Sequence, residues 1–120
     1  SGCVVIASHS HSHLDLTSRR ADKAVEVCLS KQILEDKLGG KITSFVYPFG
    51  KVNHDIHSHV QEQYSYALRI GGAANTCWDT SSKLLYRFNA DNLPSPEHPF
   101  KKAALCQYAA KGFFNRLLNR

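Results

Sequence analysis

Hydrophobic positions in the first half of the chain follow two patterns in turn. Short, largely apolar or β-branched runs, typical of buried strands, occupy residues 3–7 and 42–47. Between them, apolar residues recur at helical spacing from Ala21 to Leu38. Thr17 or Ser18 is the candidate N-cap of this helix, and two consecutive glycines after Leu38 are expected to end it.

The second half of the chain predicts two more strands and two more helices. The strands are residues 66–70 and 84–88, and the helices are residues 54–63, capped by Asn53, and roughly 98–118. Residues 73–82 are predicted to form a loop, and residues 89–99, with three prolines, a rigid connector. The residues expected to face the core from these helices are Ile56, Val60, Tyr64, Ala104, Leu105, Tyr108, Ala109, Phe113 and Leu117.

Strands that alternate with helices predict βα units and a mainly parallel sheet. Four strands and three helices are fewer than a closed barrel needs, so we expect an α/β fold, a partial or distorted (β/α) barrel. The length of 120 residues fits a single domain over residues 1–120. No apolar run approaches the roughly 20 residues that span a bilayer, so no membrane span is expected.

The net charge of +5 permits an acidic partner without requiring one. The basic residues are scattered and form no stripe with aromatic residues, so no nucleic-acid partner is expected. The cysteines are widely spaced, with no Cys-x-x-Cys pair, which argues against a structural zinc knot. Three of them lie in apolar contexts that favour packing as small hydrophobic residues, namely Cys3, Cys28 and Cys106.

Three histidines at alternate positions come after the first apolar run: His9, His11 and His13. The end of a strand is where α/β folds build their sites, and imidazole is a common ligand for zinc and other divalent metals. An extended chain would place all three on one face, whereas a turn would pair His9 with His13. A polar loop without a metal is the alternative.

The histidine run and a later turn together resemble the polysaccharide deacetylases, the NodB-homology carbohydrate esterases. His9-Ser10-His11-Ser12-His13 is similar to the family motif His-(Ser/Thr)-x-x-His, and Leu-Asp-Leu-Thr comes after it as a similar segment does in the family. Phe45-Val46-Tyr47-Pro48-Phe49-Gly50 matches part of a second motif, Arg-x-x-Pro-Tyr/Phe-Gly. The resemblance covers roughly residues 3 to 105.

The resemblance implies a metal-dependent hydrolase of a bacterial cell envelope that removes N-acetyl groups from a glycan, chitin-like or poly-N-acetylglucosamine. By the same resemblance, His9 and His13 are the ligands of a divalent metal, zinc by expectation, and Ser10 supports their loop. His11 occupies a variable position of the motif and is expected at the surface. A periplasmic, secreted or envelope-associated location is the family's expectation.

The second motif implies a substrate site. Tyr47, Pro48, Phe49 and Gly50 would form a wall of the sugar groove, and the Phe49 backbone N–H resembles the family's oxyanion donor. Arg87 and Asp91, near the end of the fourth predicted strand, could support the same edge, although a surface ion pair is an equal alternative.

The sequence also departs from the family. It has no Thr-Phe-Asp-Asp motif, which supplies a metal ligand and the general base, and no C-terminal Leu-x-His motif. Phe45 stands where the second motif has arginine. The expectation is therefore the C-terminal part of a deacetylase domain with no complete catalytic set in this chain. The alternative is a non-catalytic binding or assembly module. On the helix 54–63, His54 and His57 could share a face, but a solvated face is the favoured interpretation.

Overall fold

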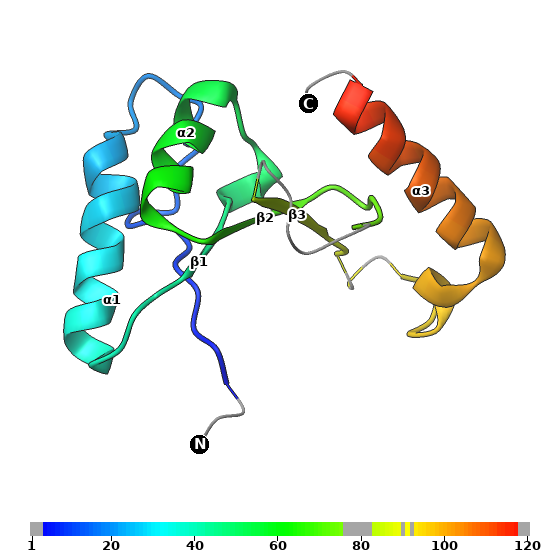
Figure 1. Ribbon diagram of the computed structural model, residues 1–120, viewed down its shortest axis with the longest axis horizontal. Helices are drawn as coiled ribbons and strands as arrows, with labels where there is room; N and C mark the ends of the chain where they lie inside the picture. Colours follow the sequence, from blue (N-terminus) through cyan, green and yellow to red (C-terminus); the bar gives the residue numbers. More distant parts are fainter. Residues whose placement is uncertain (1–3, 76–82, 90, 92, 118–120) are drawn as a thin grey trace.

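A computed structural model describes residues 4–75, 83–89, 91 and 93–117. Three parallel strands form one open sheet in the order β1-β2-β3, and Figure 1 shows α3 standing apart from α1 and α2. The elements are η1 (Ala24–Leu29), α1 (Ser30–Leu38), β1 (Ser44–Val46), η2 (Pro48–Gly50), α2 (His54–Gln63), β2 (Tyr66–Ile70), β3 (Leu84–Arg87), η4 (His98–Phe100) and α3 (Lys102–Leu117). The predicted α/β fold with parallel strands and three α-helices is confirmed.

The first predicted strand is only partly formed. Ser8 makes a single parallel bridge with Phe45, through Ser8 N–H to Ser44 O at 2.9 Å and Val46 N–H to Ser8 O at 2.8 Å. The residues before it, Val4, Val5 and Ile6, are 72, 81 and 44 % exposed. The prediction of a buried strand over residues 3–7 was therefore wrong for residues 4–6, because no described element covers them; Cys3 lies outside the described residues.

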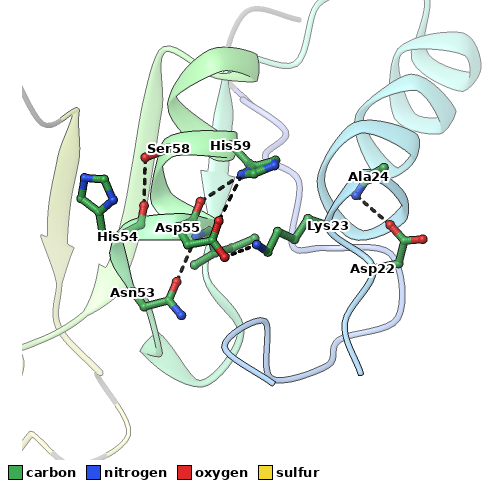
Figure 2. A network of polar contacts seen from close by, with 9 residues as sticks. Asp22, Lys23, Ala24, Asn53, His54, Asp55, Ser58 and His59 are labelled. Carbon is green, nitrogen blue, oxygen red and sulfur yellow. Dashed lines mark hydrogen bonds and ion pairs between the residues drawn. The ribbon is translucent and has the colours of Figure 1, made fainter. Parts of the chain in front are cut away.

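The first helix begins later than predicted. Asp22, rather than Thr17 or Ser18, caps it, since its carboxylate accepts from the N–H group of Ala24 (Figure 2). The same oxygen also accepts from the N–H group of Val25. A π-helical segment, η1, runs into α1, and Gly39 ends α1 in the left-handed conformation with φ +66°, as the paired glycines predicted.

The second helix matches its prediction. Asn53 caps α2 by accepting a hydrogen bond from Ile56 N–H at 2.9 Å, and Ile56, Val60 and Tyr64 are buried. These side chains pack with the face of the sheet that carries Phe45, Tyr47 and Ala67, and with η1. The whole buried cluster is Leu16, Val27, Ile42, Phe45, Tyr47, Ile56, Val60, Tyr64 and Ala67.

The last helix departs most from its predicted burial. Of its expected core residues, Ala104 is buried and Tyr108 is half-buried, while Leu105, Ala109, Phe113 and Leu117 are exposed. The helical spacing was right, but among the described residues only one narrow face of α3 is packed. Cys106, expected to be packed, is exposed and Cys28 is half-buried. Among the described residues, no helix is long and apolar enough to cross a membrane.

Candidate functional site

The histidine loop starts where the chain leaves the sheet. The Ser8 bridge carries the backbone alongside β1 and delivers His9 to the carboxyl edge of the strands, where α/β folds place their sites. His9 Nδ1 lies 2.7 Å from the carbonyl oxygen of Val46, the last residue of β1. A carbonyl only accepts, so Nδ1 donates and the Nε2 of a neutral His9 holds the free lone pair. A backbone acceptor of this kind commonly orients a metal-binding histidine.

His13 is brought back towards His9 by a tight turn. Ser10 and His13 both have positive φ, +67° and +53°, and the His13 N–H donates to Ser10 Oγ at 3.0 Å. The two imidazole centroids lie 4.8 Å apart, and the His13 ring is equally close to the ring of Phe49. The loop thus pairs His9 with His13, as the turn interpretation of their spacing requires, and His11 is exposed beside them.

Glu26 holds this loop in place through hydrogen bonds, and the sequence alone did not predict this role. Its carboxylate, in η1, is 2 % exposed and accepts from the N–H groups of His11 at 3.0 Å and Ser12 at 2.9 Å. Burial alone would raise its pKa, but the bonds from Ser12, His11 and Ser10 outweigh burial and hold the pKa of Glu26 below its usual value. The one available signal was an acidic residue between Val25 and Val27 in an apolar stretch.

A second contact joins the start of the loop to the same helix. Ser8 Oγ and Ser30 Oγ, both buried, lie 3.0 Å apart, and Ser30 Oγ donates to Glu26 O at 2.7 Å. The loop is therefore fixed by β1 on one side and by η1 with the start of α1 on the other.

The Tyr-Pro-Phe-Gly turn forms the neighbouring wall. Tyr47, Pro48 and Gly50 are buried, and Phe49 is 61 % exposed with φ +57°. A positive φ is strained for a residue with a Cβ, at a cost of order 1–3 kcal/mol. Of these four residues, Phe49 presents its ring to solvent, and Tyr47, Pro48 and Gly50 are buried beneath it.

The hydroxyl of Tyr47 meets His57 from α2. Tyr47 Oη and His57 Nδ1 lie 2.7 Å apart. Burial raises the pKa of Tyr47 well above its usual value, and the positive charge of Arg69 offsets only part of that effect. Tyr47 stays protonated at neutral pH, and the tautomer of His57 sets which of the two groups donates. The favoured interpretation of His57 as a residue on a solvated helix face was therefore wrong, since its ring secures the turn from inside.

The other predicted site residues are Arg87 and Asp91. Arg87, at the end of β3, is half-buried, and its Nε has no hydrogen-bond partner within the described part of the chain. Asp91 is exposed and its N–H donates to Asn89 Oδ1 at 3.2 Å; among the described residues no ion pair joins it to Arg87. The exposed side of α2 carries a separate polar network, in which Asp55 pairs with Lys23 and lies 3.9 Å from His59 Nδ1 (Figure 2).

The two imidazoles form an incomplete set of metal ligands. Within the described ranges, no three or more His, Cys, Asp or Glu side chains gather at a possible metal site. The nearest carboxylate in sequence, Asp15, is engaged by Lys51 at 2.6 Å and by Thr17, and these hydrogen bonds lower the pKa of Asp15 to about 2. Two imidazoles, one of them oriented by a hydrogen bond, supply part of the ligand set of a divalent metal. A carboxylate ligand would have to be added to complete the set.

Comparisons with known proteins bear on this arrangement. The family model for polysaccharide deacetylase matches residues 1–68, which include the histidine loop and the Tyr-Pro-Phe-Gly turn. Two solved structures share the fold, one from Bacillus anthracis and one from Bacillus cereus, both described as polysaccharide deacetylases. Each has a TM-score of 0.62 and 21 % identity over 68 % of this chain and 26 % of theirs.

The chain thus spans about a quarter of the length of these solved structures. A search of curated proteins gives no significant match. The structural likeness identifies the open sheet as part of their fold and confirms the expectation of a partial (β/α) barrel. Because the family model covers more than half of the 120 residues, including both motifs, the chain belongs to the polysaccharide deacetylase family.

Proposed function

We propose that this chain is part of a metal-dependent carbohydrate deacetylase that hydrolyses N-acetyl groups of a polysaccharide, such as a chitin-like or poly-N-acetylglucosamine glycan. The observation that carries the proposal is the pairing of His9 with His13, whose rings lie 4.8 Å apart at the carboxyl edge of the sheet. The Val46 carbonyl fixes the tautomer of His9 and leaves Nε2 available as a ligand. Membership of the family supports the same chemistry.

His9 and His13 would hold a divalent metal, with zinc as the first candidate because it favours imidazole ligands. When bound, such a metal supplies Lewis acidity for polarising an amide carbonyl. Glu26 and Ser10 keep the loop in the conformation that pairs the two rings. A carboxylate ligand and a general base, which the described residues do not offer at this edge, would come from polypeptide beyond this sequence.

Phe49 would contact the sugar. Its exposed ring stands against His13, and an aromatic face suits the apolar face of a pyranose ring. The buried neighbours Tyr47 and Gly50 hold the turn, and the Phe49 peptide N–H is the candidate oxyanion donor. In this proposal Tyr47, Pro48 and Gly50 serve the substrate site by holding the turn.

A non-catalytic binding or assembly module is the second candidate. It is favoured by the absence, within the described residues, of a third metal ligand beside the two imidazoles. In such a module the same edge would recognise a glycan without cleaving it.

Zinc titration by calorimetry tests the metal site. The chain should bind one zinc ion, His9→Ala and His13→Ala should each abolish measurable binding, and His11→Ala, in the same loop, should leave it unchanged. Equal binding by all three variants would remove the assignment. Acetate release from chitin oligosaccharides, measured on a longer polypeptide that supplies the carboxylate ligand and the base, then separates the two candidates. Metal-dependent turnover that His9→Ala and His13→Ala abolish would exclude the non-catalytic module.

A further inference from the structure

Within the described part of the chain, helix α3 packs on the rest of the protein through one narrow face. Ala74 N–H donates to Tyr108 O at 3.0 Å, and the Tyr108 ring packs on Phe88 with centroids 4.4 Å apart. A Cβ on Gly112 would lie 3.1 Å from Ala74 O, so the helix backbone approaches residue 74 closely at this point. Ala104, Tyr108 and Gly112 are spaced by four, which places the packed face along a single line of the helix.

The opposite face of α3 is apolar and exposed. Cys106, Ala110, Phe113 and Leu117 have the 4-3-4 spacing of one helix face, and all are exposed. Phe113, Phe114 and Leu117 are 59, 60 and 64 % exposed, and Phe100, just before the helix, is 76 % exposed. Figure 1 shows that neither α1 nor α2 comes near this helix. We call Cys106, Ala110, Phe113, Phe114 and Leu117 the outer face of α3.

The charges around this face have one sign. Residues 98–117 include Lys101, Lys102, Lys111 and Arg116 and contain no aspartate or glutamate. The three lysines are exposed. Lys101 and Lys102 lie at the start of the helix, whereas the Lys111 ammonium lies on the side of α3 that faces Gly72. An apolar helix face with aromatic side chains and flanking cations is the pattern of a helix that lies in the plane of a membrane, where the cations meet anionic headgroups.

The positive charge also decides whether a second copy of the chain or a lipid surface covers the outer face of α3. A second copy of the chain would bring an identical set of cations against this one, and like charges across an interface are unfavourable. An anionic lipid surface would cover the apolar side chains and neutralise Lys101 and Lys102 at the same time. It also requires no pocket, which suits the broad display of Phe113 and Phe114.

We propose that the outer face of α3 binds the surface of anionic membranes, with the helix lying in the interface and the sheet directed away from the lipid. The proposal is independent of the metal site, because none of the residues involved belongs to the histidine loop or the Tyr-Pro-Phe-Gly turn. It would place the deacetylase-like edge at a membrane surface.

Vesicle sedimentation tests this with the whole chain. The chain should sediment with vesicles of phosphatidylcholine and phosphatidylglycerol in equal parts, far less with phosphatidylcholine alone, and less as salt is raised. The double variant Phe113→Ser and Phe114→Ser should weaken binding at least about tenfold, since each ring loses its apolar burial. Leu38→Ser, which changes a 53 % exposed leucine at the end of α1, is the matched control and should bind as the parent does.

Charge reversal provides a second route that leaves the apolar face intact. Lys101→Glu with Lys102→Glu should weaken binding at least about tenfold, since each lysine near an anionic surface contributes on the order of 1 kcal/mol. Lys37→Glu with Lys41→Glu, both exposed near the end of α1, is the control with equal net charge and should weaken it much less. Circular dichroism confirms that each variant is folded.

Three outcomes would overturn the proposal. The first is absence of binding to anionic vesicles at low salt. The second is binding that the α3 variants and their controls reduce equally, which would indicate attraction by net charge alone. The third is a dimer, seen by light scattering, that both α3 variants dissociate while vesicle binding is absent, which would assign the outer face to a second copy.

Discussion

Removal of the Glu26 carboxylate should loosen the histidine loop and destabilise the fold. The side chain is 2 % exposed, and one oxygen, Oε2, accepts from the amides of both His11 and Ser12. Each hydrogen bond to a charged group contributes about 1.5–3 kcal/mol. Because the loop is exposed, water can reach the released amides, so we expect Glu26→Ala to cost about 3 kcal/mol, the lower end of the sum for two bonds.

Glu26→Gln should cost about half as much, since an amide oxygen can accept both bonds without the charge. The pH dependence results from the lowered pKa of Glu26, whose usual value is 4.5. A carboxyl with a lower pKa in the folded state adds stability that is present above the unfolded-state pKa. That stability is lost as the pH falls through the folded-state value. The parent should therefore lose stability below about pH 4.5 more steeply than Glu26→Gln.

Urea denaturation at neutral and acid pH, together with zinc titration, measures both effects. Glu35→Ala is the matched control, because the Glu35 carboxylate also holds a backbone amide, that of Ile42 at 2.9 Å, but lies far along the chain from the loop. It should cost about 1.5 kcal/mol and leave zinc affinity unchanged. Glu26→Ala should lower zinc affinity about tenfold or more, as loss of supporting residues around metal ligands does. Parent-like stability and zinc affinity in Glu26→Ala would refute the anchoring role.

Two further substitutions test the turn beside the loop. Gly50→Ala should cost about 2 kcal/mol, since Gly50 has φ +67° and a new Cβ would lie 3.0 Å from Ile70 O; Gly39→Ala, with φ +66° and open space, should cost only about 1 kcal/mol in the same urea unfolding assay. Equal losses would contradict a close approach at Gly50. Tyr47→Phe should cost about 1 kcal/mol through the lost bond to His57. Because the pKa of Tyr47 is raised above 10.0 in the folded state, the parent should lose stability as pH rises above 10 and the variant less so; unchanged alkaline unfolding in the variant would contradict this.

Local signals in the sequence predicted the parts of the fold that depend on neighbouring residues. The Asn53 cap, the stop at Gly39 and the buried stripe of Ile56 and Val60 all depend on contacts within one helix or turn, and the structure confirms each. The end of a strand also positions the residues directly after it, so the order of apolar and polar residues was enough to predict the place of His9 at the carboxyl edge.

Contacts between distant segments could not be predicted in this way. Glu26 reaches the amides of residues 11 and 12, and Tyr47 reaches His57 across the turn into α2. Each partner is an ordinary residue of its own segment, and only the packing of η1 and α2 against the sheet brings them together. The structure thus adds two supporting side chains, Glu26 and His57, that lie outside both family motifs.

The hydrophobic pattern predicted burial at Val4 to Ile6 and on the outer face of α3, and both are exposed. At both places the spacing identified residues suited to burial, and at both the described chain leaves them exposed. The spacing shows that a face is apolar, whereas its burial depends on which other segments can pack against it. For α3, the lysines near the apolar face indicate what would cover it, because lysine is almost never buried in a protein core without an acidic partner. Residues 4–6 carry no charge that would indicate the chemistry of a partner. The membrane proposal therefore rests on α3 alone.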